Sequence, residues 1–237
     1  MNRAFAFFVA MVAALPAAAQ DILIIGEIHD NPAHHEFQAE MVQAFVPGAL
    51  VFEMLTSEQA ARITPAKRKD MHALAEAVDW ADSGWPDFAM YYPIFEAAPE
   101  AHIYGAQVPR DIARAAFDKG IADSFSGDAA RFGLTNPLPE AEQDEREAMQ
   151  MAAHCDALPE HLVPAMVDIQ RLRDAELARV AVQAMQDTGG PVAVITGNGH
   201  ARRDWGMPVY LERAAPELEL RVIGQNEDGA ELRGIFD

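Results

Sequence analysis

Five segments of the chain have the character of strands, and helical segments separate them. They are residues 22–25, 49–54, 101–107, 192–196 and 218–223. The first and fourth are apolar runs without polar alternation, which is typical of strands buried on both faces of a parallel sheet. The pattern therefore predicts an α/β fold with a mostly parallel central sheet flanked by helices, in a single domain over residues 21–237.

The first predicted helix, residues 31–45, carries two adjacent histidines near its start. Asn31 fits the N-cap position and Pro32 the first helical turn. His34 falls on the apolar face of this helix, whereas His35 lies about 100° further round, at the border of that face. We therefore expect His34 to point inward, with His35 less buried.

Residues 56–98 predict a large helical insertion between the second and third strands. Its aromatic patch comprises Trp80, Trp85 and the segment 88–95. Aromatic residues at this density either pack between helices or form the wall of a pocket for a flat ligand. In the second interpretation, Tyr91 or Tyr92 would be the polar group of the pocket.

Two further helices are expected in the second half of the chain. Residues 139–153 begin with an acidic run, which suits the positive end of a helix dipole and indicates a solvated face rather than a metal site. Residues 164–187 predict the longest helix, with apolar residues at helical spacing. Residues 121–139 between the third strand and these helices have the composition of a loop.

Residues 1–20 have the pattern of a Sec-type signal peptide. Arg3 supplies a basic region, residues 5–15 form an apolar run too short to span a bilayer, and residues 17–19 offer a small-residue cleavage site. We therefore expect the mature chain to be periplasmic or secreted, with no transmembrane segment. No cysteine lies near the cleavage site, so we expect no lipid anchor.

The net charge limits the binding partners that the protein can have, and the cysteine count limits its disulfides. The net charge of −19 makes nucleic acid and anionic membrane surfaces poor partners. Cys155 is the single cysteine, so the chain forms no internal disulfide. That residue is either buried and inert or serves as a ligand or thiol.

The candidate chemistry lies where two predicted strands end in the same pattern, Gly-x-x-His. One instance ends in His29 and the other in His200, while Glu53 follows a third strand. Ligand sites in open α/β sheets lie beyond the carboxyl ends of strands. If the two strands are neighbours, His29 and His200 converge with Glu27 and Glu53. Such a group can bind a divalent metal, supply a general base or contact a cofactor; alternatively, each histidine only braces its own loop.

Several short motifs, taken together, are similar to those of the ChaN-like family of haem-binding, iron-regulated proteins. They are Gly-Glu-Ile-His-Asp-Asn-Pro-x-His-His at 26–35, Phe-Glu-Met at 52–54, Tyr-Pro-Ile at 92–94, Gly-x-Gln-x-Pro-Arg at 105–110, His-Cys at 154–155, Gln-Arg-x-Arg-Asp at 170–174, and Gly-Asn-Gly-His-x-Arg at 197–202 followed by Trp205 and Pro208. The resemblance runs through nearly the whole mature chain in the same order. The wider superfamily includes erythromycin-esterase-like proteins and TraB/Tiki-type metallopeptidases.

The resemblance implies a haem-binding dimer at the cell envelope, with stacked haems, a tyrosine ligand on iron and a histidine from the partner subunit. Carried over to this sequence, Tyr92 is the first choice for the axial ligand and Tyr91 the second, and His154 is the cross-contact. Arg110 and Arg202, with Arg203 as a further candidate, would pair with the haem propionates. Family members are often lipoproteins, and this chain departs from them in lacking a lipidation cysteine.

Two functions follow from these patterns. The first is a periplasmic haem-binding protein that takes part in haem or iron uptake or handling. The alternative is a hydrolase, a peptidase or esterase, that uses Glu27, His29, Glu53 and His200 as catalytic residues. In a metal-dependent version His29 and His200 are the ligands and a glutamate activates water. In a metal-free version one histidine is the general base.

Overall fold

The protein is described by a computed structural model that covers residues 20–227 and 232–237. Residues 1–19 of the predicted signal peptide lie outside the described residues. The described chain contains one five-stranded sheet in the order β3-β2-β4-β1-β5, in which every neighbouring pair is parallel. The strands are β1 (Ile22–Glu27), β2 (Ala49–Phe52), β3 (His102–Gly105), β4 (Val192–Gly197) and β5 (Leu220–Ile223). The predicted α/β fold with a parallel sheet is confirmed.

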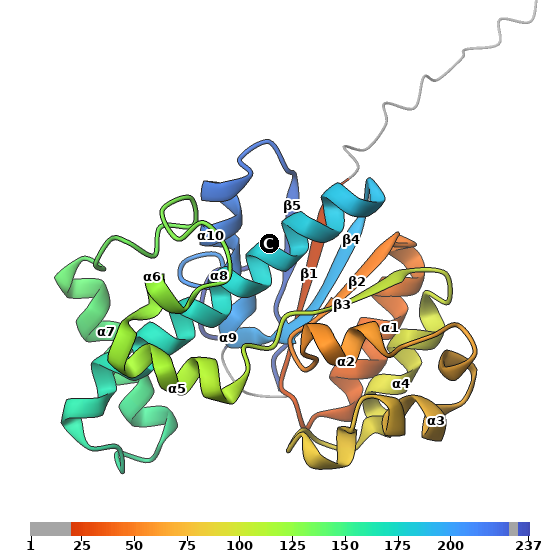
Figure 1. Ribbon diagram of the computed structural model, residues 1–237, viewed down its shortest axis with the longest axis horizontal. Coiled ribbons are helices and arrows are strands. Elements are labelled where there is room, and N and C mark those ends of the chain that lie inside the picture. The colour runs from red at the N-terminus through yellow and green to blue at the C-terminus, as the bar shows by residue number, and fades with distance from the viewer. Residues whose placement is uncertain (1–19, 228–231) are drawn as a thin grey trace, which may run out of the picture.

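Helices cover both faces of this sheet, as Figure 1 shows. Alternate residues of β1 point to opposite faces, so that Ile22 and Ile24 join one buried cluster and Leu23 and Ile25 the other. The first cluster packs against α5 (Arg110–Lys119), α6 (Ile121–Ser124), α8 (Val163–Thr188) and α10 (Met207–Ala214). The second packs against α1 (Pro32–Phe45), α3 (Met71–Ala77) and α4 (Phe88–Ala97).

The predicted helical insertion between β2 and β3 is present and is built from short pieces. It contains α2 (Ser57–Ala61), η1 (Lys67–Lys69), α3, η2 (Trp80–Asp82) and α4. Most of its aromatic residues are core, because Phe95 stacks on Phe52 of β2 with ring centroids 4.4 Å apart and Trp80 packs against Tyr91 at 4.9 Å. The packing interpretation of the aromatic patch therefore holds for these residues.

The remaining helices are α7 (Glu140–Ala153), η3 (Glu160–Leu162) and α9 (Asn198–Ala201). α7 and α8 match the predicted helices within a few residues, whereas the segment predicted as loop contains the short helix α6. Cys155 is exposed and unbonded, so of the two alternatives for this thiol the buried one is wrong. In the described part of the chain, no helix is both long enough and apolar enough to cross a bilayer.

Candidate active site at the carboxyl end of the sheet

The two Gly-x-x-His motifs meet because β4 lies beside β1, with Glu27 and Gly197 paired in register. Each motif crowds the glycine of the other. A Cβ atom at Gly197 would lie 2.9 Å from Nε2 of His29, and a Cβ atom at Gly26 would collide with the side chain of Asn198. Only glycine fits at either position without displacing a neighbour. The expected convergence of the motifs is therefore confirmed, and it depends on both glycines.

Glu27 is the centre of the first half of the site. His29 donates from Nδ1 to Oε1 of Glu27 at 2.7 Å, and the Tyr91 hydroxyl donates to the same oxygen at 3.0 Å. Nδ1 of His35 lies 3.3 Å from Oε2, while Nε2 of His35 donates to the carbonyl oxygen of His29 at 2.9 Å. An ionised carboxylate only accepts, so protons on the nitrogens of both histidines that face it stabilise this arrangement.

The electrostatics of this half keep Glu27 ionised and favour charged imidazoles. Burial alone would raise the pKa of Glu27, but hydrogen bonds and positive charge from His29 and His35 lower that pKa to about 2. For both histidines burial would lower the pKa, and the hydrogen bond and negative charge of Glu27 raise it instead. The carboxylate thus fixes the orientation of both rings.

His29 is the member of the group that reaches solvent. Its side chain is 33% exposed, and its ring packs against Trp85 with centroids 4.8 Å apart. Because Nδ1 is held by Glu27, Nε2 points away from that carboxylate and lies beside Gly197, and among the described residues it has no hydrogen-bond partner. A carboxylate-oriented imidazole with a free nitrogen is the arrangement required of a general base.

The second half of the site encloses His200. Nδ1 of His200 lies 2.6 Å from Oδ1 of Asp174 on α8, and Nε2 lies 3.5 Å from Oε1 of Glu53. The other oxygen of Glu53 accepts from the Thr196 hydroxyl at 2.6 Å and from the Gly197 amide at 2.8 Å. His200 is therefore held between two buried carboxylates.

That position fixes the charge of His200. Burial would lower the pKa of this imidazole, but Glu53 and Asp174 outweigh burial and raise the pKa to about 9. The pKa of Glu53 is lowered, because His200, His29 and the two hydrogen bonds to its carboxylate outweigh its burial. At neutral pH, His200 is thus an imidazolium and Glu53 a carboxylate.

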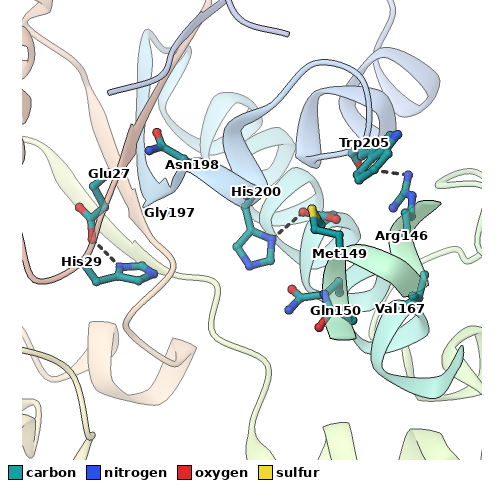
Figure 2. A pocket seen from close by; sticks show the side chains of 13 residues that line it. Glu27, His29, Arg146, Met149, Gln150, Val167, Gly197, Asn198, His200 and Trp205 are labelled. Carbon is teal, nitrogen blue, oxygen red and sulfur yellow. Dashed lines mark hydrogen bonds and ion pairs between the residues drawn. The ribbon is translucent and has the colours of Figure 1, made fainter. Parts of the chain in front are cut away.

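A cavity of about 300 Å³ lies between the two halves of the site. In Figure 2, Glu27 and His29 lie on one side of it, and Arg146, Met149 and Trp205 lie on the opposite side, with His200 between them. Its lining is completed by Gln150, Val167, Gln170, Asp174, Gly197, Asn198 and Gly199. The free nitrogen of His29 therefore faces a space large enough for a small ligand or for part of a larger one.

Each of the two histidines has a carboxylate at Nδ1, a contact that orients Nε2 and is compatible with the general-base role and with the predicted metal-ligand role. His29 and His200 each direct Nδ1 at a carboxylate, and Nε2 of His200 faces Glu53. Over residues 20–227 and 232–237, no group of three or more His, Cys, Asp or Glu side chains is arranged to hold a metal ion. Without a metal, the arrangement supports proton transfer at His29 beside a fixed positive charge at His200.

The two predicted tyrosine ligands have different surroundings. Tyr91 is 0% exposed and its hydroxyl donates to Glu27, so it belongs to the site just described. Burial and the negative charge of Glu27 both raise the pKa of Tyr91, which opposes formation of a phenolate. Tyr92 is half-buried on α4 and donates to the carbonyl oxygen of Arg68 at 3.1 Å.

The other residues expected to contact haem lie on or next to three different helices, α7, α5 and α9. His154 is exposed at the end of α7; its Nδ1 donates to the Gln150 carbonyl at 2.8 Å, which leaves Nε2 outward. Arg110 is exposed at the start of α5. Arg202 is buried, lies over Trp205 at 3.7 Å and donates twice to Asp204, so its guanidinium is already paired.

Sequence reasoning missed two members of the site. His35 was expected to be less buried than His34, and this was wrong, because His35 is 0% exposed and faces Glu27. His34 is also buried, but its Nδ1 accepts from the Ile28 amide at 2.9 Å and has a bracing role. Asp174 stands out in the sequence only as part of a motif; its place on α8 beside a strand-end histidine could not be read from local pattern.

Comparison with known proteins places the chain in a family. A family model described as "Haem-binding uptake, Tiki superfamily, ChaN" matches residues 13–211. A solved structure of cofacial haem binding to ChaN of Campylobacter jejuni superposes with a TM-score of 0.68 at 18% identity, covering 91% of this chain and 85% of that one. The structure of the type III effector HopBA1 gives a TM-score of 0.40 at 13% identity, covering 77% and 69% of the two chains.

A search of curated proteins found no significant match. At 18% identity the likeness to the Campylobacter jejuni protein shows a common fold, and the family model carries the assignment. It spans most of the chain, including both Gly-x-x-His motifs and the residues around Glu53. The chain belongs to the ChaN family of haem-binding uptake proteins, in the Tiki superfamily.

Proposed function

We propose that this protein binds haem and takes part in haem or iron uptake or handling, in the periplasm. The observation that carries the proposal is the match to the haem-binding family model over residues 13–211. ChaN of Campylobacter jejuni binds haem cofacially, and that protein shares the fold described here. The predicted signal peptide supports the location.

Two side chains are suited to hold the iron. Tyr92 lies on α4, and its hydroxyl donates to the carbonyl oxygen of Arg68. To bind iron, this hydroxyl would have to give up that hydrogen bond. His154 presents a free Nε2 on an exposed helix end and could reach a haem held by a second copy of the chain. Tyr91 does not fit, because its hydroxyl is buried on Glu27. When bound, haem supplies an iron centre that these ligands hold without turnover.

Haem titration tests this proposal directly. The purified protein should develop a Soret band at micromolar haem, and Tyr92→Phe should weaken and shift it, whereas the matched control Tyr104→Phe should not. The Tyr104 hydroxyl donates to Asp187, and the side chain lies on β3, outside the helix α4 that carries Tyr92. His154→Ala should reduce any haem-dependent increase in molar mass measured by light scattering. No Soret band with the unaltered protein would overturn the proposal.

A second candidate function is favoured by one observation, the free Nε2 of His29 above the cavity. In a metal-free hydrolase this nitrogen would take a proton from water as the water attacks an ester or amide carbonyl, and Glu27 would hold the resulting imidazolium. The imidazolium of His200 would stand beside the developing negative charge. The two functions are compatible, because they use different side chains.

An ester and peptide hydrolysis screen separates this candidate from haem binding. Activity should fall by about 100-fold or more in His29→Ala, and remain unchanged in His72→Ala, which removes an exposed histidine on α3. Because the pKa of His29 is raised, the rate should rise with pH as that imidazole loses its proton, at a higher pH than for an ordinary imidazole. Activity that survives His29→Ala excludes the proposed base.

A further inference from the structure

A second cleft, of about 500 Å³, lies between α5, α8 and the loop that precedes α4. It shares no lining residue with the cavity at His29, yet both spaces border the same helix. Arg173 of α8 lines the cleft, and the next residue along that helix, Asp174, lines the cavity. α8 therefore separates two neighbouring spaces at the carboxyl end of the sheet.

The two spaces meet at the strand-end residues. Glu53 lines the cleft, and its Oε1 lies 3.5 Å from Nε2 of His200, which lines the cavity. Trp85 also lines the cleft, and its ring packs against that of His29 at 4.8 Å. A Cβ atom at Gly197 would lie 2.9 Å from Nε2 of His29 and 3.7 Å from Oε2 of Glu53. A ligand that occupies both spaces therefore has its middle beside the free nitrogen of His29.

The cleft is positively charged, in a chain whose net charge is −19. Three arginines line it, namely Arg110 and Arg114 on α5 and Arg173 on α8. Six other arginines pair with carboxylates, whereas in the described part of the chain none of these three has an ion-pair partner. Arg110 donates to a backbone carbonyl oxygen, that of Ser83, at 3.2 Å. The single carboxylate of the lining, Glu53, already accepts hydrogen bonds within the protein.

Arg173 is the arginine of the three whose charge reaches the strand-end residues. It is half-buried, so its charge is less screened than that of a surface arginine. Burial lowers the pKa of His200 and the charge of Arg173 acts in the same direction, although Glu53 and Asp174 outweigh both. Because its charge is felt at His200, Arg173 lies where it can bind an anionic group of a ligand that also reaches His29.

The cavity on the other side of α8 has a different character. Its charged side chains are already paired: His29 with Glu27, His200 with Asp174 and Arg146 with Glu142. The apolar part of its lining comprises Met149, Val167 and Trp205. One end of the combined space therefore suits an anionic group, and the other end suits an uncharged, apolar group.

We propose that the cleft and the cavity form one elongated substrate site for an ester that carries an anionic group on one side of the scissile bond and an apolar group on the other. This inference rests on the proposed hydrolase function of His29. His29 takes a proton from water, the water oxygen bonds to the carbonyl carbon, and the ester C–O bond breaks as that proton passes to the alcohol. Arg173 determines specificity, because it binds the anionic group and takes no part in bond making.

Two aromatic esters with a terminal carboxylate test this inference. Monophenyl adipate carries its carboxylate on the acyl side and 6-(benzoyloxy)hexanoate on the alcohol side, and the methyl ester of each is its uncharged partner. At least one acid should be hydrolysed with a kcat/KM about 10-fold or more above that of its methyl ester, the effect of a charge-assisted hydrogen bond. Arg173→Gln should remove this preference by raising KM for the acid, with kcat and the methyl-ester kinetics unchanged. Arg173→Lys should restore part of it.

Binding of the adipate dianion, measured by calorimetry, tests the cleft without any turnover. Adipate should bind about 10-fold or more tightly than uncharged adipamide, and Arg173→Gln should remove the difference. Arg179→Gln is the matched control, because Arg179 is half-buried on the same helix, pairs with Glu176 and lines neither space. It should keep both preferences, and far-UV circular dichroism of each variant verifies folding.

The outcomes separate this inference from the function on which it rests. Equal kcat/KM for the acids and their methyl esters, or equal binding of adipate and adipamide, overturns the inference and leaves the hydrolase function in place. An Arg173→Gln variant that behaves like Arg179→Gln overturns it as well. If none of the four esters is hydrolysed while adipate binds selectively through Arg173, the hydrolase function fails and the anion-binding cleft stands. If neither hydrolysis nor selective binding is found, both fail.

Discussion

The ends of β1 and β4 carry the same four-residue pattern, yet their histidines have opposite surroundings. His29 is held by one carboxylate and turns Nε2 toward a cavity, with a third of its side chain exposed. His200 lies between two carboxylates, and only 11% of its side chain is exposed. The pattern therefore sets where an imidazole stands, and the neighbouring helices decide what it can do. α8 supplies Asp174 to His200, whereas no helix supplies a second acid to His29 in the described part of the chain.

The largest difference between the two motifs should appear in stability. His200→Ala leaves Asp174 and Glu53 buried without their shared cation, which should cost about 3–5 kcal/mol of unfolding free energy. His29→Ala removes one hydrogen bond from a carboxylate that keeps His35 and Tyr91, and should cost about 0.5–1.5 kcal/mol. Urea denaturation measures both, and equal losses would mean that the two motifs are energetically alike.

The glycines of the β4 motif give the next largest effect. Gly197→Ala places a methyl group 2.9 Å from His29 Nε2 and should cost about 1–3 kcal/mol through displacement of that ring. Gly199→Ala is the control, since its added Cβ has no atom within 4 Å apart from its chain neighbours and the backbone of its own helix, and it lies in α9, where alanine is preferred. The unfolding midpoints should therefore move in opposite directions. A harmless Gly197→Ala would show that the motifs are less tightly packed than described.

The free energy of unfolding should depend on pH differently for His200 and for Glu27, the centre of the first half of the site. The pKa of His200 is raised from an ordinary value of about 6.5 to about 9, so its contribution is complete below the first value and is lost as pH rises through the second. The pKa of Glu27 is lowered to about 2, so its contribution is complete above about 4.3 and is lost on acidification. Thermal unfolding from pH 6 to 10 should show a falling midpoint, with a shallower fall in His200→Gln.

The smallest effect concerns Tyr91, whose hydroxyl donates to Glu27 in the first half of the site. Tyr91→Phe removes one donor from Oε1 of Glu27 and should cost about 0.5–1.5 kcal/mol. Because one stabilising contact to the carboxylate is gone, the pKa of Glu27 should rise, and the acid-side loss of stability should begin at higher pH. Acid titration followed by tryptophan fluorescence measures that shift. An unchanged acid transition would show that the hydroxyl is not part of the network.

Local pattern predicted the sheet and the position of the two strand-end histidines, because both follow from apolar runs and from a turn that needs glycine. It did not predict Asp174, whose contact with His200 depends on how α8 crosses the sheet. His35 was misjudged since a helical wheel of α1 considers only the helix, whereas Glu27 of the neighbouring strand draws that ring inward. The contact of Tyr91 with Glu27 also could not be predicted, because an aromatic cluster in the sequence does not reveal which of its rings are buried.

β1 and β2 follow each other in sequence but do not pair, because β4 lies between them and hydrogen-bonds to both. The central position between β2 and β1 can be occupied only after residues 192–197 have been synthesised. Glu27 and Glu53 therefore cannot acquire their shared surroundings from the first four-fifths of the polypeptide, and long-range strand pairing of this kind slows folding. A chain cut before β4 would expose two unpaired apolar edges side by side, so we expect nonsense products of this length to aggregate rather than fold into a smaller working unit.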